Sequence, residues 1–197
     1  MRIRKVGVAA LFLLILMGPG RQGVRAQGQA TMAPAQTGPG FTLSTNAFED
    51  GSIIPAKYTQ AVPNPVTPEL KWSNVPAGTV SFVVILHDPD GAPMKRLETY
   101  MHWMLFNIPG NVTELPEGIP AIPKLPDGTI QIKNGHGDVG YRGPGMGAAG
   151  PYHHYTFEIY ALEIKLDLGP DATRADVLKA MDGHIIGKAT MGGRFHR

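Results

Sequence analysis

The sequence predicts one domain built mainly of antiparallel β-strands, with a single short helix near its C-terminal end. From residue 41 to residue 168, short apolar or alternating segments are separated by Pro and Gly, a pattern typical of antiparallel β folds. Only one later segment has the spacing of a helix. The chain of 197 residues, 43% of them hydrophobic, is long enough to bury one sizeable core and short for two domains.

Six alternating segments predict six strands in the first part of the domain. They are expected at Phe41–Thr45, Leu70–Ser73, Val80–His87, Tyr100–Ile108, Thr129–Lys133 and Tyr155–Leu166. The stretch 109–127 is rich in proline, which cannot donate to a central ladder, so we expect an irregular loop there. The last segment, 184–195, is apolar enough to return to the sheet, and Gly192 and Gly193 permit a bend in it.

The helix is expected at Thr173–Met181. Thr173 can cap its first turn, and Asp176 lies three residues later, near the positive end of the helix dipole. The apolar residues in between form a stripe along one face. Gly183 is suitably placed to end the helix.

The N-terminus has the three parts of a secretory signal in residues 1–26. Basic residues precede the apolar run Val6–Met17, and a small residue, Ala26, permits cleavage after it. The run of about twelve residues is shorter than the roughly 20 that span a bilayer. Residues 27–40 have the composition of a disordered lead-in, so the folded domain is expected at 41–197. We therefore expect an exported protein, periplasmic or secreted.

Composition excludes several classes of function. The chain has no cysteine, which excludes disulfides, thiol catalysis and the cysteine of a lipoprotein anchor. Charged residues make up only 17% and the formal net charge is +2, with no basic stripe of the kind that binds nucleic acid. We expect no nucleic-acid partner and no cofactor.

Acidic and imidazole side chains gather at the ends of two predicted strands. The first strand ends in His87 and Asp88, Asp90 follows in a Pro- and Gly-stiffened turn, and the next strand carries His102. Because side chains alternate along a strand, we expect His102 to share a face with the apolar residues 104 and 106, and residues 101, 103 and 105 to share the other.

A second group of candidate residues follows the Gly-rich stretch 140–151. On the strand after it, alternation places His153, Tyr155 and Phe157 on one face and His154 on the other. Imidazole and phenol donate hydrogen bonds, and loop amides can cradle the oxygens of an anion. This arrangement predicts a small polar pocket, although a turn or a strand histidine taken singly is more often structural.

Both segments resemble the signatures of the phosphatidylethanolamine-binding protein family, in its bacterial Raf-kinase-inhibitor-like branch. The first signature is an Asp-Pro-Asp turn at 88–90 followed by the strand with His102. The second is the Gly143-Pro144 turn followed by His153-His154-Tyr155. The resemblance covers 41–197. The chain departs from the pattern at Gly91, an insertion, and at residues 145–147, which replace further prolines.

The resemblance implies a fold and a site. The fold is a large antiparallel sheet packed on a smaller one, with a short helix near the C-terminus. The pocket for the anion would be lined by Asp88, His102, His153 and Tyr155. Gly143 would offer a backbone amide, and Asp90 would brace the turn. His87 and His154 are not pocket positions. The ligand-binding residues implied are Asp88, Asp90, His102, Gly143, Pro144, His153 and Tyr155.

The leading hypothesis is a binding protein for a small anion or a phospholipid headgroup. Since carboxylates repel anions, Asp88 must pair with a protonated histidine or with an ammonium group of the ligand. One alternative is a metal-dependent hydrolase that uses Asp88 with His87, His102 or His153. Another is an inhibitor of an envelope protease or of another protein partner. Peripheral membrane contact is compatible with the sequence, which does not predict the oligomeric state.

Overall fold

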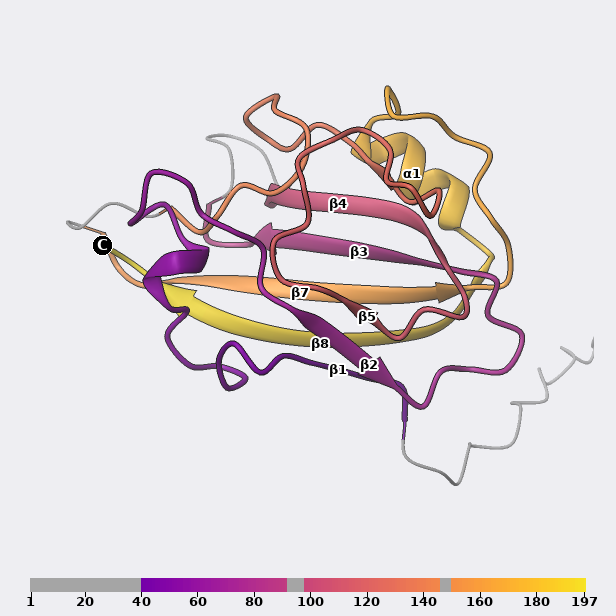
Figure 1. Ribbon diagram of the computed structural model, residues 1–197, viewed down its shortest axis with the longest axis horizontal. Helices are drawn as coiled ribbons and strands as arrows, with labels where there is room; N and C mark the ends of the chain where they lie inside the picture. The colour runs from indigo at the N-terminus through magenta and orange to yellow at the C-terminus, as the bar shows by residue number, and fades with distance from the viewer. Residues whose placement is uncertain (1–39, 92–97, 146–149) are drawn as a thin grey trace, which may run out of the picture. The chain divides into compact units, whose positions relative to one another are not determined.

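The protein is described by a computed structural model, which covers residues 40–91, 98–145 and 150–197 (Figure 1). The predicted signal and most of the lead-in lie outside these residues. The predicted fold class is confirmed, because the chain forms two antiparallel sheets and one α-helix. No helix among the described residues is long and apolar enough to cross a membrane.

The larger sheet has five strands in the order β6-β4-β3-β7-β8, and Figure 1 shows its four long strands side by side. Every neighbouring pair is antiparallel. The smaller sheet has three strands in the order β1-β2-β5, also antiparallel. The strands are β1 (Thr42–Ser44), β2 (Leu70–Ser73), β3 (Ser81–Asp88), β4 (Tyr100–Pro109), β5 (Glu114–Leu115), β6 (Ile130–Gln131), β7 (His153–Leu162) and β8 (Ile185–Phe195). A 3-10 turn, η1, spans Ala56–Tyr58, and the α-helix, α1, spans Arg174–Met181.

The Pro-rich stretch and the end of β7 differ from the prediction. The Pro-rich stretch contains a short strand, β5, because the buried Leu115 pairs with Leu70 of β2 despite the surrounding prolines. The strand β7 ends at Leu162 rather than at Leu166. Beyond it, the buried side chain of Asn107 takes over the backbone pairing, since its Nδ2 donates to the Leu166 carbonyl at 2.9 Å and its Oδ1 accepts from the Leu166 amide at 2.8 Å.

The predicted faces of β4 are confirmed for residues 103–106 and wrong for Met101 and His102, because the strand has a bulge at His102. The pairing of β3 with β4 shifts register there, so two successive side chains lie on the same face. As a result, Met101 packs with Met104 and Phe106 in one cluster, and Trp103 packs in another. The His102 ring meets the Tyr155 ring edge-on at 5.2 Å. The bulge therefore turns His102 toward the residues of β7.

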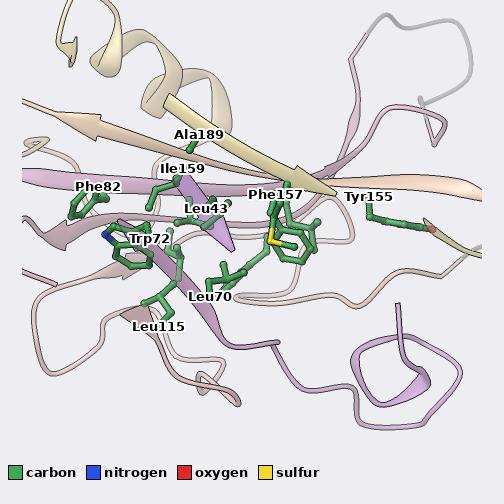
Figure 2. Close-up of a cluster of buried hydrophobic side chains, with 14 of the residues drawn as sticks. Leu43, Leu70, Trp72, Phe82, Leu115, Tyr155, Phe157, Ile159 and Ala189 are labelled. Atoms are coloured by element: carbon green, nitrogen blue, oxygen red, sulfur yellow. The ribbon is translucent and has the colours of Figure 1, made fainter. Parts of the chain in front are cut away.

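The main core lies between the two sheets (Figure 2). Strands β1, β2 and β5 contribute Leu43, Leu70, Trp72 and Leu115, and the larger sheet contributes the facing side chains of β3, β4, β7 and β8. Because the sheet is covered on both faces, β3 reads as an unbroken apolar run rather than as an alternating one. Tyr155 belongs to this cluster and lies at one end of it (Figure 2).

The opposite face of the larger sheet is covered by α1. Val177 and Met181 of the helix pack with Val83 and Ile85 of β3 in a second cluster. The predicted cap is confirmed, since Thr173 and Asp176 form a reciprocal capping box.

The final strand passes through Gly192 and Gly193 without losing register with β7. A Cβ at Gly193 would lie 2.5 Å from Cγ1 of Ile54. Glycine thus allows close approach there rather than a bend.

Candidate functional site

A pocket of about 190 Å³ lies where β3 ends and where β4 and β7 begin. We call it the strand-end pocket. It is lined by Gln60, Asp88, Gly91, Tyr100, His102, Arg142, Gly145, His153 and Tyr155. The four side chains that the resemblance assigned to the lining, two from β3 and β4 and two from β7, therefore come together.

Asp88 is the buried centre of this site, with only 4% of its surface exposed. Its Oδ1 accepts the backbone amides of Asp90 and Gly91, each at 2.8 Å, and its Oδ2 lies 2.7 Å from Nδ1 of His153. Because a carboxylate accepts, the proton of this last bond is on Nδ1 of His153. Three donors thus satisfy the carboxylate, and the imidazole presents Nε2 as the nitrogen that can meet a ligand.

His102 forms a second wall and has a different electrostatic character. Its Nδ1 donates to the carbonyl of Arg142 at 2.9 Å, and the Arg142 amide donates back to the His102 carbonyl at 2.9 Å. Burial lowers the pKa of the imidazole below its ordinary value, which favours the neutral ring. The ring also lies edge-on to Tyr100, with centroids 4.8 Å apart.

Tyr155 connects the pocket to the Gly-rich stretch. Its side chain is buried, and its hydroxyl accepts the amide of Gly145 at 3.2 Å. The alternation predicted for β7 is confirmed, since Tyr155 and Phe157 share the inner face and the His153 ring lies 6.4 Å from that of Tyr155. The loop amide that reaches this pocket is that of Gly145.

Asp90 lies outside the lining and holds the turn against β7. Its Oδ2 accepts both the backbone amide and Nδ1 of His154, each at 2.8 Å. The amide, followed by the imidazole, lowers the pKa of the Asp90 carboxyl below its usual range. His154 itself is exposed and does not line the pocket; the resemblance implied that it is not a pocket position.

Gly143 and Pro144 are buried behind the pocket rather than on its surface. The Gly143 carbonyl accepts from Nε2 of Gln60 at 2.7 Å, and the Pro144 carbonyl accepts the Gln60 amide at 2.8 Å. A Cβ at Gly143 would lie 2.7 Å from the Tyr58 carbonyl, so close packing requires glycine there. In this geometry the two residues position the loop that carries Gly145.

His87 lies away from the strand-end pocket. Its Nδ1 bonds to the Thr99 hydroxyl at 3.0 Å, and its Nε2 lies 3.8 Å from the Glu158 carboxylate. Among the residues that the structure describes, no group of three histidine and acidic side chains is arranged to hold a metal ion. Asp88 already has three donors, so the geometry lends no support to the hydrolase hypothesis.

Five lining residues were not among the predicted site residues: Gln60, Gly91, Tyr100, Arg142 and Gly145. Gln60 comes from the irregular chain after η1, and no local pattern marks it. Tyr100 lies two residues before His102 on the same strand, so alternation could have placed it beside that ring. Arg142 and Gly145 lie within the Gly-rich stretch that was recognised, but which of its residues faces the pocket depends on contacts with distant segments.

Comparison with known proteins finds the same domain in other organisms. A UPF0098 protein of Methanothermobacter thermautotrophicus is 43% identical over 157 residues, covering 80% of this chain and 99% of the relative. LppC of Mycobacterium tuberculosis, a candidate lipoprotein by its name, is 32% identical; the aligned region covers 82% of this chain and 75% of LppC. The crystal structure of the phosphatidylethanolamine-binding protein homologue CT736 from Chlamydia trachomatis superposes with a TM-score of 0.69 at 32% identity, covering 80% and 98% of the two chains.

A family model matches nearly the whole of the described domain. The model of the family described as phosphatidylethanolamine-binding protein matches residues 44–196, which include strands β2–β8, the helix and every residue of the strand-end pocket. On sequence and fold together, this chain belongs to the phosphatidylethanolamine-binding protein family, in its bacterial branch.

Proposed function

We propose that the protein binds a phosphate or a phosphorylated headgroup in the strand-end pocket. The observation that carries this proposal is the 2.7 Å contact between Asp88 and His153. It fixes the imidazole with Nδ1 toward the carboxylate and Nε2 toward the ligand. When His153 is protonated, its Nε2–H is a charged donor to a phosphate oxygen.

The remaining walls supply complementary groups. Arg142 lines the pocket, and its planar guanidinium can donate two hydrogen bonds to the oxygens of a phosphate or carboxylate. Neutral His102 can accept a hydrogen bond from a phosphate hydroxyl, and Tyr155 also lines the pocket. Asp88 is bonded to two backbone amides and to Nδ1 of His153, so its role is to orient the imidazole.

Binding of inorganic phosphate, measured by titration calorimetry, tests this proposal. His153→Gln removes the charged donor and should lower the affinity roughly tenfold to a hundredfold, the weight of a charge-assisted hydrogen bond. His184→Gln is the matched control, because His184 is an exposed histidine that also pairs with a carboxylate, Glu163, at 3.3 Å. The control should bind phosphate as the natural protein does.

Two results would count against the proposal. One is the absence of phosphate binding by the natural protein at pH 6. The other is an equal affinity in the His153→Gln and His184→Gln variants.

The setting proposed for this function is outside the cytoplasm. Residues 1–26 have the pattern of a secretory signal, and the relative LppC is a candidate lipoprotein by name. N-terminal sequencing of the protein from its native envelope should give Gln27 as the first residue; a chain retaining Met1 in the cytoplasm would contradict this. A protein partner stays a prediction, to be tested by affinity capture with the natural protein and His153→Gln.

A further inference from the structure

A second cavity of about 370 Å³ adjoins the strand-end pocket. The two hollows share two lining residues, Gln60 and Arg142. The far side of the second cavity is formed by Pro63, Pro65, Tyr141 and the charged groups of Asp138 and Arg197. Its size lies within the ordinary range of small-molecule sites.

Arg142 is fixed at the boundary between the two hollows. Its backbone exchanges two hydrogen bonds with His102, both 2.9 Å long, which attach it to the wall of the strand-end pocket. Its guanidinium Nη2 donates to Oε1 of Gln60 at 3.3 Å. Arg142 therefore lines both spaces, and it is held at their boundary by its backbone and by its side chain.

Gln60 forms the rest of the partition. Its amide and its Nε2 hold the carbonyls of Pro144 and Gly143, and its carbonyl accepts from the guanidinium of Arg197. Every polar group of Gln60 is thus engaged, so its side chain is ordered rather than free to sweep across the opening. Arg197 is brought to the second cavity by the same contact.

The charges around the second cavity favour an anion. Its lining includes two arginine residues, Arg142 and Arg197, and one acidic residue, Asp138. Asp138 has its own partner, since its Oδ2 lies 2.9 Å from Nδ1 of His136. Arginine forks bind carboxylate and phosphate oxygens in pairs, whereas a carboxylate already engaged with an imidazole attracts a ligand cation only weakly.

We infer that the second cavity is a subsite for a second anionic group of the same ligand. This inference rests on the proposed function, because the first phosphate would occupy the strand-end pocket. The ligand class is then a small phosphate monoester that carries a further phosphate or carboxylate a few bonds away. Arg142 would lie between the two anions, and Arg197 would contact only the second.

A series of linear phosphates tests this inference by titration calorimetry. Each compound carries a phosphate at one end of a two-, four- or six-carbon chain, and a methyl, ammonium, carboxylate or phosphate group at the other end. At one chain length, we expect a second anion to raise the affinity roughly tenfold or more over the methyl-ended compound, the weight of one charged hydrogen bond. The carboxylate and phosphate arms show which second anion is preferred.

Arg197→Gln separates the two subsites. It should abolish the gain from the second anion and leave the affinity for the methyl-ended phosphate within about twofold, because Arg197 does not line the strand-end pocket. Lys179→Gln is the control, since it removes the same charge from an exposed position on α1. It should keep the gain.

The outcomes distinguish this inference from the proposed function. If methyl-ended phosphates bind but no second anion helps at any length, the second subsite is wrong and the proposed function stands. A preference for the ammonium-ended compound would also overturn the second subsite, because it would show that the cavity binds a cation at Asp138. If Lys179→Gln loses as much of the affinity gained from the second anion as Arg197→Gln does, the gain comes from general attraction between charges, and the second subsite is wrong. If no phosphate binds at all, the proposed function itself fails.

Discussion

At the scale of single residues, the strand-end pocket depends on a turn that keeps the carboxylate of Asp88 buried. Asp88 is buried because the amides of residues 90 and 91 and the imidazole of His153 replace its water. The sequence revealed these residue types because turn chemistry and strand alternation are local. It did not reveal the face of His102, since a bulge depends on how two strands pair, nor did it reveal Gln60, which arrives from a distant loop.

Gly91, which is an insertion relative to the family pattern, gives the first prediction. A Cβ at this position would lie 2.7 Å from Oδ2 of Asp88, the oxygen that meets His153. Gly91→Ala should therefore weaken phosphate binding at least tenfold and destabilise the fold by about 1–3 kcal/mol, the usual cost of forced overpacking. Calorimetry and urea unfolding measure the two effects.

Gly169→Ala is the control for Gly91→Ala, because a Cβ there meets nothing within 4 Å. It should leave binding and stability nearly unchanged. Equal behaviour of the two variants would show that the turn tolerates a side chain and that Gly91 does not shape the pocket.

The pH dependence of stability is the second prediction. Burial lowers the pKa of His87 and of His102 below the ordinary value of 6.5. As pH falls below 6.5, the unfolded chain takes up these protons before the folded protein does, so the free energy of unfolding must decrease. Urea unfolding at pH 7.5 and pH 5.5 should show this loss.

His87→Gln isolates part of that effect without touching the strand-end pocket. The loss of stability between pH 7.5 and pH 5.5 should be smaller in this variant than in the natural protein. An identical or larger loss would mean that His87 does not titrate as its burial requires.

At the scale of elements, the helix and every strand except β5 were predictable, and the end of β7 was not. The helix α1 has its cap, its dipole partner and its apolar stripe within nine residues, so local sequence determines it. The strand β5 has two residues and exists because Leu115 fits beside Leu70. The end of β7 was misplaced because the side chain of Asn107, far away in the sequence, replaces the next strand's backbone.

The cap of α1 gives the third prediction. Thr173 and Asp176 satisfy each other's backbone amides, so Thr173→Ala should lower the free energy of unfolding by about 1 kcal/mol. Thr173→Ser keeps the accepting hydroxyl and should be nearly neutral. Phosphate affinity should not change in either variant, because α1 lies on the face of the larger sheet that is opposite the main core.

Urea unfolding followed by circular dichroism provides the measurement for the cap. A loss of equal size in the Ala and Ser variants would show that the hydroxyl does not cap the helix.

At the scale of the whole molecule, one strand connects two cores. Successive side chains of β3 enter the cluster between the sheets and the cluster under α1 in turn. Both tryptophans, Trp72 and Trp103, lie in the first cluster, whereas α1 covers the second. Since the same backbone supports both clusters, we expect the described domain to unfold as one cooperative unit.

A matched pair on β3 tests this cooperativity as the fourth prediction. Leu86→Ala empties a site in the first cluster and Ile85→Ala a site in the second; both side chains are almost fully buried. Each should cost about 2–5 kcal/mol. In both variants, tryptophan fluorescence and far-ultraviolet circular dichroism should report the same unfolding midpoint. Separate midpoints in Ile85→Ala would show that the clusters unfold independently.

The central claim is that an anion occupies the strand-end pocket beside His153. A crystal structure determined in saturating inorganic phosphate tests it most directly. The account predicts a phosphate with an oxygen within about 3.2 Å of His153 Nε2, while Nδ1 keeps its contact with Asp88. An empty pocket under these conditions, or a phosphate bound elsewhere while this pocket contains only water, would contradict it.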